Sequence, residues 1–269
     1  MILTNIIPTL DGYQVLRTKA LLILLFTGSL IVAEAQILHP DLNQGIPEKG
    51  KIVSGRVSLD FMLRQDVSSF FQAGNEVDLQ RIDEKSLWLY TQRFSWARAN
   101  NQNLFNGGHA QFRRQPLPER AFGMEYYVQA QYDNVRGLKE RFLGGGNIRY
   151  LHKNDTSLFQ MGSGFFLEYE NWALAETGMR EVLRIKWNNY IRYSLTTKNG
   201  TRLSTAVFLQ TRPDAEITKP RLSAQARIQF PLSERLAFSL QGDVSYDRAP
   251  VVPINPLTYR VLQKLIYSF

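Results

Sequence analysis

The sequence of 269 residues contains no cysteine, which excludes disulfide frameworks and thiolate metal sites. It also has no apolar run of the roughly 20 residues that a membrane helix needs. The formal net charge is +8, yet lysines and arginines are spread singly and form no nucleic-acid motif. We therefore expect no nucleic-acid partner and no bound cofactor or metal, and the mature chain can cross a membrane only as strands.

An export signal is predicted at the beginning of the chain. Arg17 and Lys19 precede an apolar core over residues 20–32, and small residues occupy the positions that signal peptidase requires, before a cut between Ala35 and Gln36. The core is too short to remain as a membrane anchor. We therefore expect a signal peptide over 1–35, a periplasmic N-terminal arm over 36–51 and an exported domain over 52–269.

The exported domain consists of segments in which apolar and polar side chains alternate. Alternation with period 2 is typical of a strand that shows one apolar and one polar face. It is clearest from Phe122 to Asp133, where no residue breaks the pattern. The twelve strands predicted in this way span residues 53–65, 69–81, 86–96, 107–115, 122–133, 141–151, 157–170, 181–195, 202–210, 222–230, 236–247 and 257–269.

The connectors between these segments also show a regularity. Tight polar turns follow the fourth, sixth, eighth and tenth strands, and longer loops are predicted at 97–106, 171–180, 213–220 and 248–256. Short turns on one rim and long loops on the other are typical of outer-membrane barrels, whose short turns are periplasmic. In lipid, strands must also form a closed sheet. We therefore predict an all-β fold, a single closed antiparallel up-and-down transmembrane β-barrel of 12 strands.

The last strand, Leu257–Phe269, has the pattern of a membrane-crossing strand. One face is aromatic and aliphatic, with Tyr259 at one end and Tyr267 and Phe269 at the other, while the opposite face carries cations. We predict that this strand inserts into outer-membrane lipid and is the segment through which the barrel-assembly machinery acts.

Charged side chains occupy the faces that alternate with the apolar ones, and in a barrel they point inward. The predicted register places Glu168 opposite Arg184 and Asp247 diagonal to Arg260. The sequence leaves two readings open, a lumen closed by structural ion pairs or a narrow polar channel whose charges select a solute. The charged residues predicted to face the lumen are Arg56, Asp60, Glu125, Arg149, Glu168, Arg184, Lys186, Arg192, Arg227, Asp243, Arg260 and Lys264.

Catalytic chemistry has little support in the sequence. The three histidines, His39, His109 and His152, have no evident nucleophile and no orienting group beside them. We therefore predict a non-enzymatic protein of a Gram-negative outer membrane, with a structural, stress-related or narrow-channel role. The alternatives are an outer-membrane lipid-modifying enzyme that uses His109 and a soluble periplasmic β-sandwich, and the oligomeric state stays open.

Five motifs lie between residue 107 and the end of the chain: GGHAQFRR (Gly107–Arg114), EYYVQAQYDNV (Glu125–Val135), RFLGGGNIRY (Arg141–Tyr150), FFLEYEN (Phe165–Asn171) and SYDRAPVVP (Ser245–Pro253). Together they resemble the salt-induced outer-membrane protein family, also called domain of unknown function family 481, in its Bacteroidetes-type form. Where that pattern leads us to expect an RLS-like sequence, this chain has Val182-Leu183-Arg184. The resemblance implies an outer-membrane β-barrel of unassigned activity and carries over no catalytic residue.

Overall fold

The computed structural model describes residues 53–65, 69–83, 85–100, 102–116, 120–174, 178–214, 217–252 and 255–269, with only the backbone described for 62–65 and 69. The predicted signal peptide, its cleavage site at Ala35 and Gln36, and the arm 36–51 lie outside these residues. In the described part of the chain, no helix is long and apolar enough to span a bilayer. The strands are β1 (Val53–Gln65), β2 (Ser69–Ile82), β3 (Ser86–Ala99), β4 (Gln102–Pro116), β5 (Phe122–Asp133), β6 (Leu138–Lys153), β7 (Ser157–Leu174), β8 (Gly178–Thr196), β9 (Arg202–Thr211), β10 (Arg221–Pro231), β11 (Leu236–Asp247) and β12 (Leu257–Ser268).

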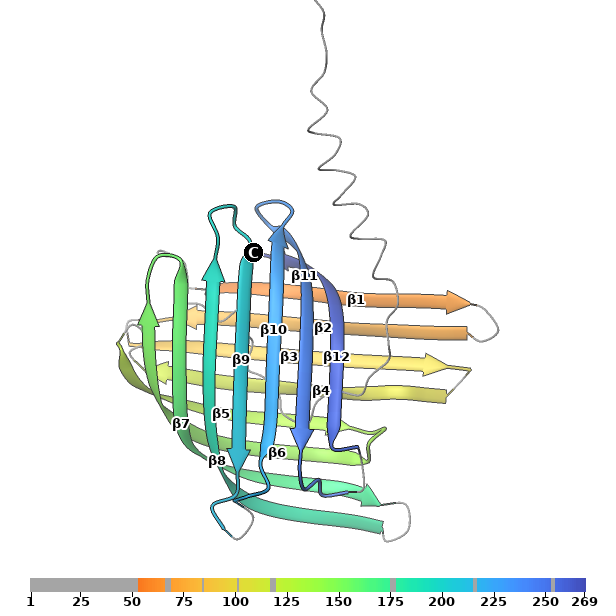
Figure 1. The fold of residues 1–269 in the computed structure, drawn as a ribbon. Coiled ribbons are helices and arrows are strands. Elements are labelled where there is room, and N and C mark those ends of the chain that lie inside the picture. Colours follow the sequence, from red (N-terminus) through yellow and green to blue (C-terminus); the bar gives the residue numbers. More distant parts are fainter. Residues whose placement is uncertain are drawn as a thin grey trace, which may run out of the picture. The chain divides into compact units, whose positions relative to one another are not determined.

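Each strand pairs antiparallel with its neighbours in the sequence (Figure 1), and the register shows that β1 also pairs with β12. This last pairing closes the sheet, so the predicted 12-stranded barrel is confirmed. We call the rim where β1 begins and β12 ends the terminal rim, and the opposite one the loop rim. The loop rim carries two long connectors, 212–220 and 248–256, of which the structure describes 212–214, 217–220, 248–252 and 255–256.

Two of the predicted long loops are wrong. β3 continues to Ala99 and β4 starts again at Gln102, while β7 continues to Leu174 and β8 starts again at Gly178. The residues predicted as loops pair with one another and lengthen these two hairpins. In these extensions a polar residue such as Arg98 stands on the outer face and an apolar one such as Trp172 is buried on the inner face, so the alternation in the sequence ends before the ladder of hydrogen bonds does.

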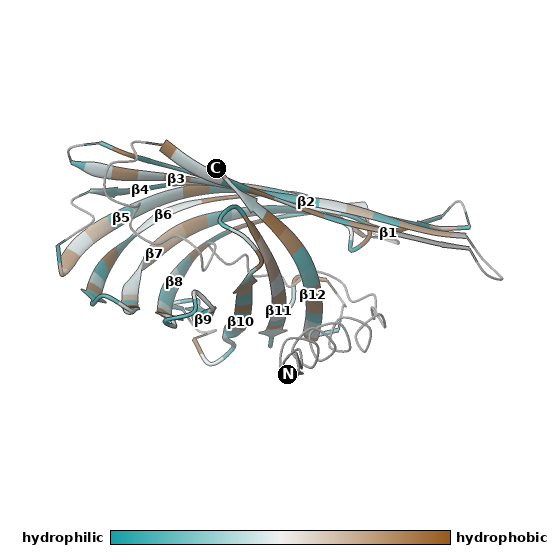
Figure 2. Cartoon of the chain, turned by 90° about the horizontal axis from the view of Figure 1, so that it is seen from above, coloured by the Kyte–Doolittle hydropathy of each residue, from teal (hydrophilic) through white to brown (hydrophobic). Residues whose placement is uncertain are grey.

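The wall of the barrel is apolar outside and polar inside. On β5, Met124, Tyr126 and Val128 are 44–58% exposed, whereas Glu125 and Tyr127 between them are buried. Figure 2 shows the resulting bands of hydrophobic and hydrophilic residues along the strands. A soluble sandwich would bury its apolar faces between two sheets. Here the apolar faces point away from the lumen, which contradicts the alternative of a β-sandwich.

Aromatic side chains gather on the outer face near both rims. At the terminal rim, Trp88 donates its indole N–H to Asp83 at 2.9 Å, and the Arg114 guanidinium lies 4.9 Å from the Trp88 ring centroid. Such girdles mark the two interfaces of a bilayer. The protein is an outer-membrane β-barrel. Near the terminal rim the girdle includes Trp88, Phe122, Tyr150, Phe159, Tyr193 and Tyr267, and near the loop rim it includes Phe61, Phe71, Trp96, Tyr132, Phe142, Tyr169, Tyr246 and Tyr259.

Glycines let β6 and β7 lie close to neighbouring atoms. A Cβ placed on Gly164 would come 2.0 Å from the carbonyl oxygen of Gly146, and one on Gly145 would come 2.3 Å from that of Phe165. Both distances are far below contact, so these positions admit only glycine. The glycines of these two strands therefore belong to the wall, consistent with close backbone approach inside a barrel.

Candidate functional site in the barrel lumen

The inward faces of the strands carry a dense set of charged side chains. Eight cations and seven carboxylates are buried there, and five further cations and two further carboxylates are half-buried on the same faces. Thirteen cations thus accompany nine carboxylates among the described residues, a surplus of four positive charges. The cations are Arg56, Arg93, Arg113, Arg141, Arg149, Arg184, Lys186, Arg192, Arg202, Arg221, Arg227, Arg260 and Lys264, and the carboxylates are Asp60, Glu76, Asp78, Glu125, Asp133, Glu168, Glu170, Asp243 and Asp247.

The charged residues predicted to face the lumen all alternate with exposed or outward residues. Eight of them are buried and four are half-buried, while their role in conduction stays a prediction. The buried ones are Glu125, Arg149, Glu168, Lys186, Arg192, Arg227, Asp243 and Lys264, and the half-buried ones are Arg56, Asp60, Arg184 and Arg260.

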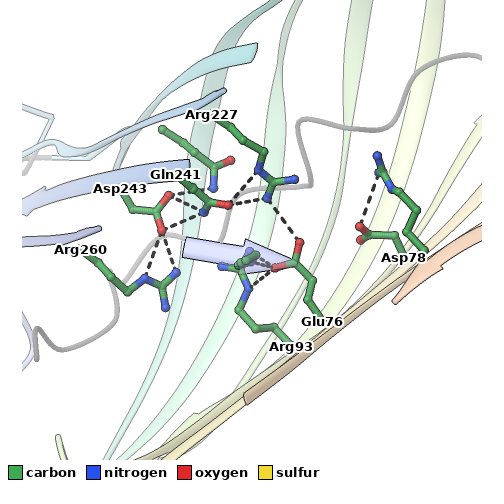
Figure 3. A network of polar contacts seen from close by, with 10 residues as sticks. Glu76, Asp78, Arg93, Arg227, Gln241, Asp243 and Arg260 are labelled. Carbon is green, nitrogen blue, oxygen red and sulfur yellow. Dashed lines mark hydrogen bonds and ion pairs between the residues drawn. The ribbon is translucent and has the colours of Figure 1, made fainter. Parts of the chain in front are cut away.

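Glu76 on β2 is the centre of the first group of ion pairs, the Glu76 cluster (Figure 3). Its carboxylate accepts from Arg93 on β3 at 2.6 Å, from Arg227 on β10 at 3.4 Å and from Lys264 on β12. Three cations from three other strands therefore share one carboxylate. A buried charge is tolerated only when it is paired and hydrogen-bonded, which this arrangement provides.

The Glu76 cluster continues along β11 and β12. Gln241 accepts from the Arg227 guanidinium at 2.9 Å and donates to Asp243 at 2.8 Å. Asp243 in turn accepts from Arg260, its direct partner in the register, at 2.7 Å. With Arg93, Arg227, Arg260 and Lys264 against Glu76 and Asp243, the cluster has two more cations than carboxylates.

A second group, the Glu168 cluster, connects β6, β7, β8, β10 and β11. Glu168 pairs with Arg141, with Lys186 and with Arg221, the last at 3.2 Å. Arg221 also pairs with Asp247 at 2.9 Å. Adding Glu170, which lies 3.4 Å from Arg141, the cluster contains three cations and three carboxylates. Its charges therefore balance.

A third group surrounds Glu125 on β5, which is fully buried. Arg113 donates to it at 3.1 Å and Asn147 at 2.7 Å. The guanidinium of Arg192 lies over the rings of Tyr190 and Phe208, 5.3 and 5.8 Å from their centroids. These contacts combine ion pairing with cation–π interaction, which is strongest where water is excluded.

The predicted pairing of Asp247 with Arg260 is wrong. The β11–β12 ladder ends with Tyr246 opposite Leu257, so Asp247 lies just beyond it, where it pairs with Arg221. The opposition of Glu168 and Arg184 is present in the β7–β8 register, although Glu168 pairs with Lys186, two residues further along β8, and with Arg141 and Arg221 on other strands. Register therefore predicts which residues are neighbours better than it predicts which charges pair.

Four cations in these clusters were not singled out from the sequence. Arg221 lies one residue before the predicted start of its strand, at residue 222. The other three lie inside predicted strands, on the faces that alternate with the apolar ones. Listing every charged residue of those faces would have included them. The four are Arg93, Arg113, Arg141 and Arg221.

Inward side chains of strands that are not neighbours in the sheet meet across the described lumen. A cavity beside Arg113, Gln129 and Asn188 has a volume of about 20 Å³, which is about the space of one water molecule. Barrels of eight strands are filled by side chains, whereas porins of 16 to 18 strands hold an aqueous channel. With 12 strands, this barrel lies between the two groups in size.

The long connector between β11 and β12 covers part of the loop rim. Val251 and Val252 are buried against Leu138 and Trp172, two inward side chains of β6 and β7. Arg180 also donates to the carbonyl oxygen of Val251 at 2.7 Å. The connector is thus held over the mouth by an apolar contact and a hydrogen bond.

The described residues offer no obvious catalytic or metal centre. His109 is buried and points inward, with Arg93 and Gln131 as its register neighbours, and His152 is exposed near the terminal rim. Neither has a serine, threonine or carboxylate as its register partner. In this part of the chain, no group of three metal-ligating side chains comes together.

No family model and no curated protein matches the chain. The NanC porin is similar in structure with a TM-score of 0.48 at 5% identity, covering 80% of this chain and 98% of the porin. The KdgM porin gives 0.44 at 7%, covering 81% and 99%. The translocator domain of the autotransporter NalP from Neisseria meningitidis gives 0.43 at 7%, covering 96% and 95%. At these values the likeness carries no solute or activity over to this chain.

Proposed function

We propose that the protein is a narrow outer-membrane channel that favours anions. The observation that carries the proposal is the surplus of four positive charges on the described inward faces. A lumen lined by one excess sign of charge, with low-dielectric walls, raises the local concentration of the opposite ion. Arginine and lysine rings are the arrangement that anion pores use.

The clusters argue for a narrow passage. Glu76 and Arg227, which lie on β2 and β10, meet inside the barrel, as do Glu168 and Arg221 on β7 and β10. A solute has to pass between these side chains, or displace them, to cross the membrane. Small anions fit this space, whereas solutes of the size that general porins pass do not.

We further propose that the loop rim faces the outside of the cell, because long connectors of outer-membrane barrels are extracellular. The connector at 248–252 then covers the outer mouth. An anion entering from outside first meets Val251 and Val252 and then the balanced Glu168 cluster. The Glu76 cluster, with two more cations than carboxylates, contributes half of the surplus.

Current recordings on the refolded full chain in planar bilayers test this function. Under a KCl gradient, we expect a reversal potential of the sign that chloride preference produces and a unitary conductance far below that of a 16-stranded porin. Arg149→Gln and Arg192→Gln should each move the reversal potential toward zero. Arg235→Gln, in an exposed turn, is the matched control and should leave it unchanged. A porin-sized conductance or a preference for potassium contradicts the proposal.

We also propose that β12 is the strand on which the barrel-assembly machinery acts. Tyr267 and Phe269 are both exposed on its outer face at the end of the chain. Phe269→Ala should reduce the amount of folded barrel in the outer membrane while leaving refolding in detergent intact. Tyr259→Ala, at the other end of the same face, is the control. Equal losses from both variants would count against a terminal signal.

The non-enzymatic reading and the family resemblance stay predictions. The alternative of a lipid-modifying enzyme depends on His109, and replacing it by alanine should leave the membrane-lipid profile unchanged. A changed profile would favour the enzyme. Membership of the salt-induced outer-membrane family is proposed from the sequence motifs alone.

A further inference from the structure

The outer wall of the barrel has a hollow of about 910 Å³ over the middle of β5 to β9, which we call the outer hollow. Two short polar side chains form its floor, Ser163 on β7 and Asn189 on β8, which are register partners on the outer face. In the sheet, Ile148 on β6 is the other neighbour of Ser163, and Leu209 on β9 is the other neighbour of Asn189. The wall is recessed here because the two polar side chains are shorter than the apolar ones beside them.

The floor of the outer hollow lies between the two aromatic girdles. Phe159 of the terminal-rim girdle comes four residues before Ser163, and Tyr169 of the loop-rim girdle comes six residues after it. On β8, Tyr193 of the terminal-rim girdle comes four residues after Asn189. Four residues of strand span about 13 Å, or about 10 Å of depth at the usual tilt of such strands. Both polar side chains therefore face the hydrocarbon layer and not the lipid head groups.

The two polar side chains can bond to a ligand. The indole N–H of Trp187 donates to the Ser163 hydroxyl oxygen at 2.8 Å, so the hydroxyl proton is left to donate. The Asn189 amide has two N–H donors and an acceptor oxygen, and no hydrogen bond joins it to another described residue. Lipid chains offer no hydrogen-bonding group, and a polar group left unsatisfied in hydrocarbon is costly. An occupant that supplies a polar group of its own is therefore favoured.

Apolar side chains surround the polar floor. Met161 and Phe165 on β7 and Ile191 on β8 flank it along the strands and are 47–54% exposed. The ring of Phe165 also stacks on that of Trp187, with the centroids 6.4 Å apart. A pocket of this volume that is mostly apolar, with a few converging polar groups, is typical of a small-molecule site.

Depth and hydrogen bonding together select the kind of occupant. An acyl chain fills the hollow but does not bond to the Asn189 amide, and a lipid head group would have to leave the interface to reach it. A charged group is strongly disfavoured at this depth. A second copy of the barrel that used the same surface would bring a hollow of its own opposite this one, so both would stay empty. A neutral, mainly apolar molecule with one polar group meets both conditions.

We propose that the outer hollow is a binding site for a neutral hydrophobic small molecule with one carbonyl or hydroxyl group, which enters from the bilayer. The polar group of the ligand bonds to Asn189 and Ser163, and its apolar body lies against Met161, Phe165 and Ile191. The site is on the outer wall, so this inference does not depend on conduction through the lumen. A barrel that conducts nothing can still bind the ligand, and a conducting barrel can lack the site.

Fluorescence titration with Prodan, a neutral naphthalene ketone, tests the site on the folded full chain in dodecyl maltoside micelles. We expect energy transfer from tryptophan to Prodan that saturates as the probe is added. Asn189→Leu removes the amide and should weaken the saturable binding about tenfold. Asn75→Leu replaces a half-buried asparagine on the outer face of β2, away from the hollow, and is the matched control that should leave binding unchanged.

A second variant and two competitors make the test specific. Ser163→Phe places a ring in the outer hollow and should abolish the saturable transfer. The competitor 2-acetylnaphthalene should displace Prodan at a mole fraction about tenfold lower than 2-ethylnaphthalene, which has the same rings and no carbonyl group. The folded fraction of each variant is checked first by its heat-dependent migration on gels.

The other outcomes contradict the proposal in distinguishable ways. Transfer that never saturates, or that is the same in the parent and in Asn189→Leu, would mean that the probe only partitions into the micelle or that the amide does not bind it. Equal displacement by the two naphthalenes would reduce the hollow to an apolar groove. A parent that sediments as a dimer, with Ser163→Phe as a monomer, would assign the surface to a second copy of the chain instead.

Discussion

Lys264 on β12 donates a hydrogen bond to Glu76 on β2, and Arg227 on β10 pairs with the same carboxylate at 3.4 Å. One acid thus joins strands from both ends of the chain. Removing its charge takes away the carboxylate that Arg93, Arg227 and Lys264 share. Breaking a buried ion pair by removing one partner typically costs about 3 to 5 kcal/mol.

We accordingly expect Glu76→Gln to lower the free energy of unfolding by about 3 kcal/mol or more. Urea unfolding in phosphatidylcholine vesicles, followed by tryptophan fluorescence, measures it. The control is Asp214→Asn, which breaks the exposed pair with Arg212. Exposed ion pairs contribute about 0 to 1 kcal/mol, so the control should change the free energy of unfolding very little. Similar losses in both variants would show that the Glu76 cluster is not a structural centre.

Two adjacent glycines on β6 should differ in whether they tolerate replacement by alanine. At Gly145, a Cβ would meet the carbonyl oxygen of Phe165 at 2.3 Å, whereas at Gly144 the nearest atom is 3.5 Å away. Overpacking against backbone typically costs about 1 to 3 kcal/mol or more. We expect Gly145→Ala to reduce refolding yield and stability, and Gly144→Ala to refold like the parent. A tolerated Gly145→Ala would show that β6 and β7 are farther apart than described.

The apolar contact that holds the β11–β12 connector at the loop rim can be removed by changing its partner on β7. Trp172 packs against Val251 and Val252, so Trp172→Ala should release the connector. Replacing a buried tryptophan by alanine costs about 3 to 5 kcal/mol of packing free energy. The loosened connector should then present the peptide bond after Arg248, which is already an exposed residue, to a protease more often. Faster tryptic cleavage after Arg248 is the expected result. Trp187→Ala, on the outer face, should leave the cleavage rate unchanged.

The turn between β2 and β3 predicts a dependence on pH. The hydrogen bond from the Trp88 indole, with those from the backbone N–H groups of Lys85 and Ser86, lowers the pKa of Asp83. A carboxyl group with a lowered folded pKa stabilises the protein above its unfolded pKa, and this stabilisation is lost as the pH falls through the folded pKa. The stability difference between the parent and Asp83→Ala should therefore shrink on acidification.

Carbon-13 NMR of the Asp83 carboxyl group in detergent micelles measures the pKa directly. Trp88→Phe removes the indole donor and should move that pKa back toward its usual value. An unchanged titration in this variant would assign the shift to the backbone donors instead.

The sequence predicted the wall of the barrel well because lipid imposes one repeated rule on every strand. The predicted start of β1 at Val53 and the predicted strand at Phe122–Asp133 agree with the structure. The rule fails where strands leave the apolar layer, so the extensions of β3 and β7 were missed. Alternation also says nothing about the loops. The length of the loop at 212–220 was predicted correctly only because a proline stands near each of its ends.

The lumen was less predictable, for a physical reason. Alternation tells which side chains point inward, and it placed residues such as Glu125 and Arg227 there. Which charges pair depends on contacts across the barrel, as between Glu76 and Arg227, and these exist only after closure. The short β1–β12 ladder is likewise a property of the closed sheet and has no sequence pattern of its own.

Ion pairs that join β2 to β10 and β12 have a consequence for how the molecule is made. The carboxylate of Glu76 leaves the ribosome long before Arg227 and Lys264 are synthesised. Until the last hairpin arrives, each of these groups must keep its own hydration shell. Several charged groups therefore lose their hydration together when the first and last strands meet. Before that moment, an incomplete barrel offers these charges no site within the bilayer where they are paired.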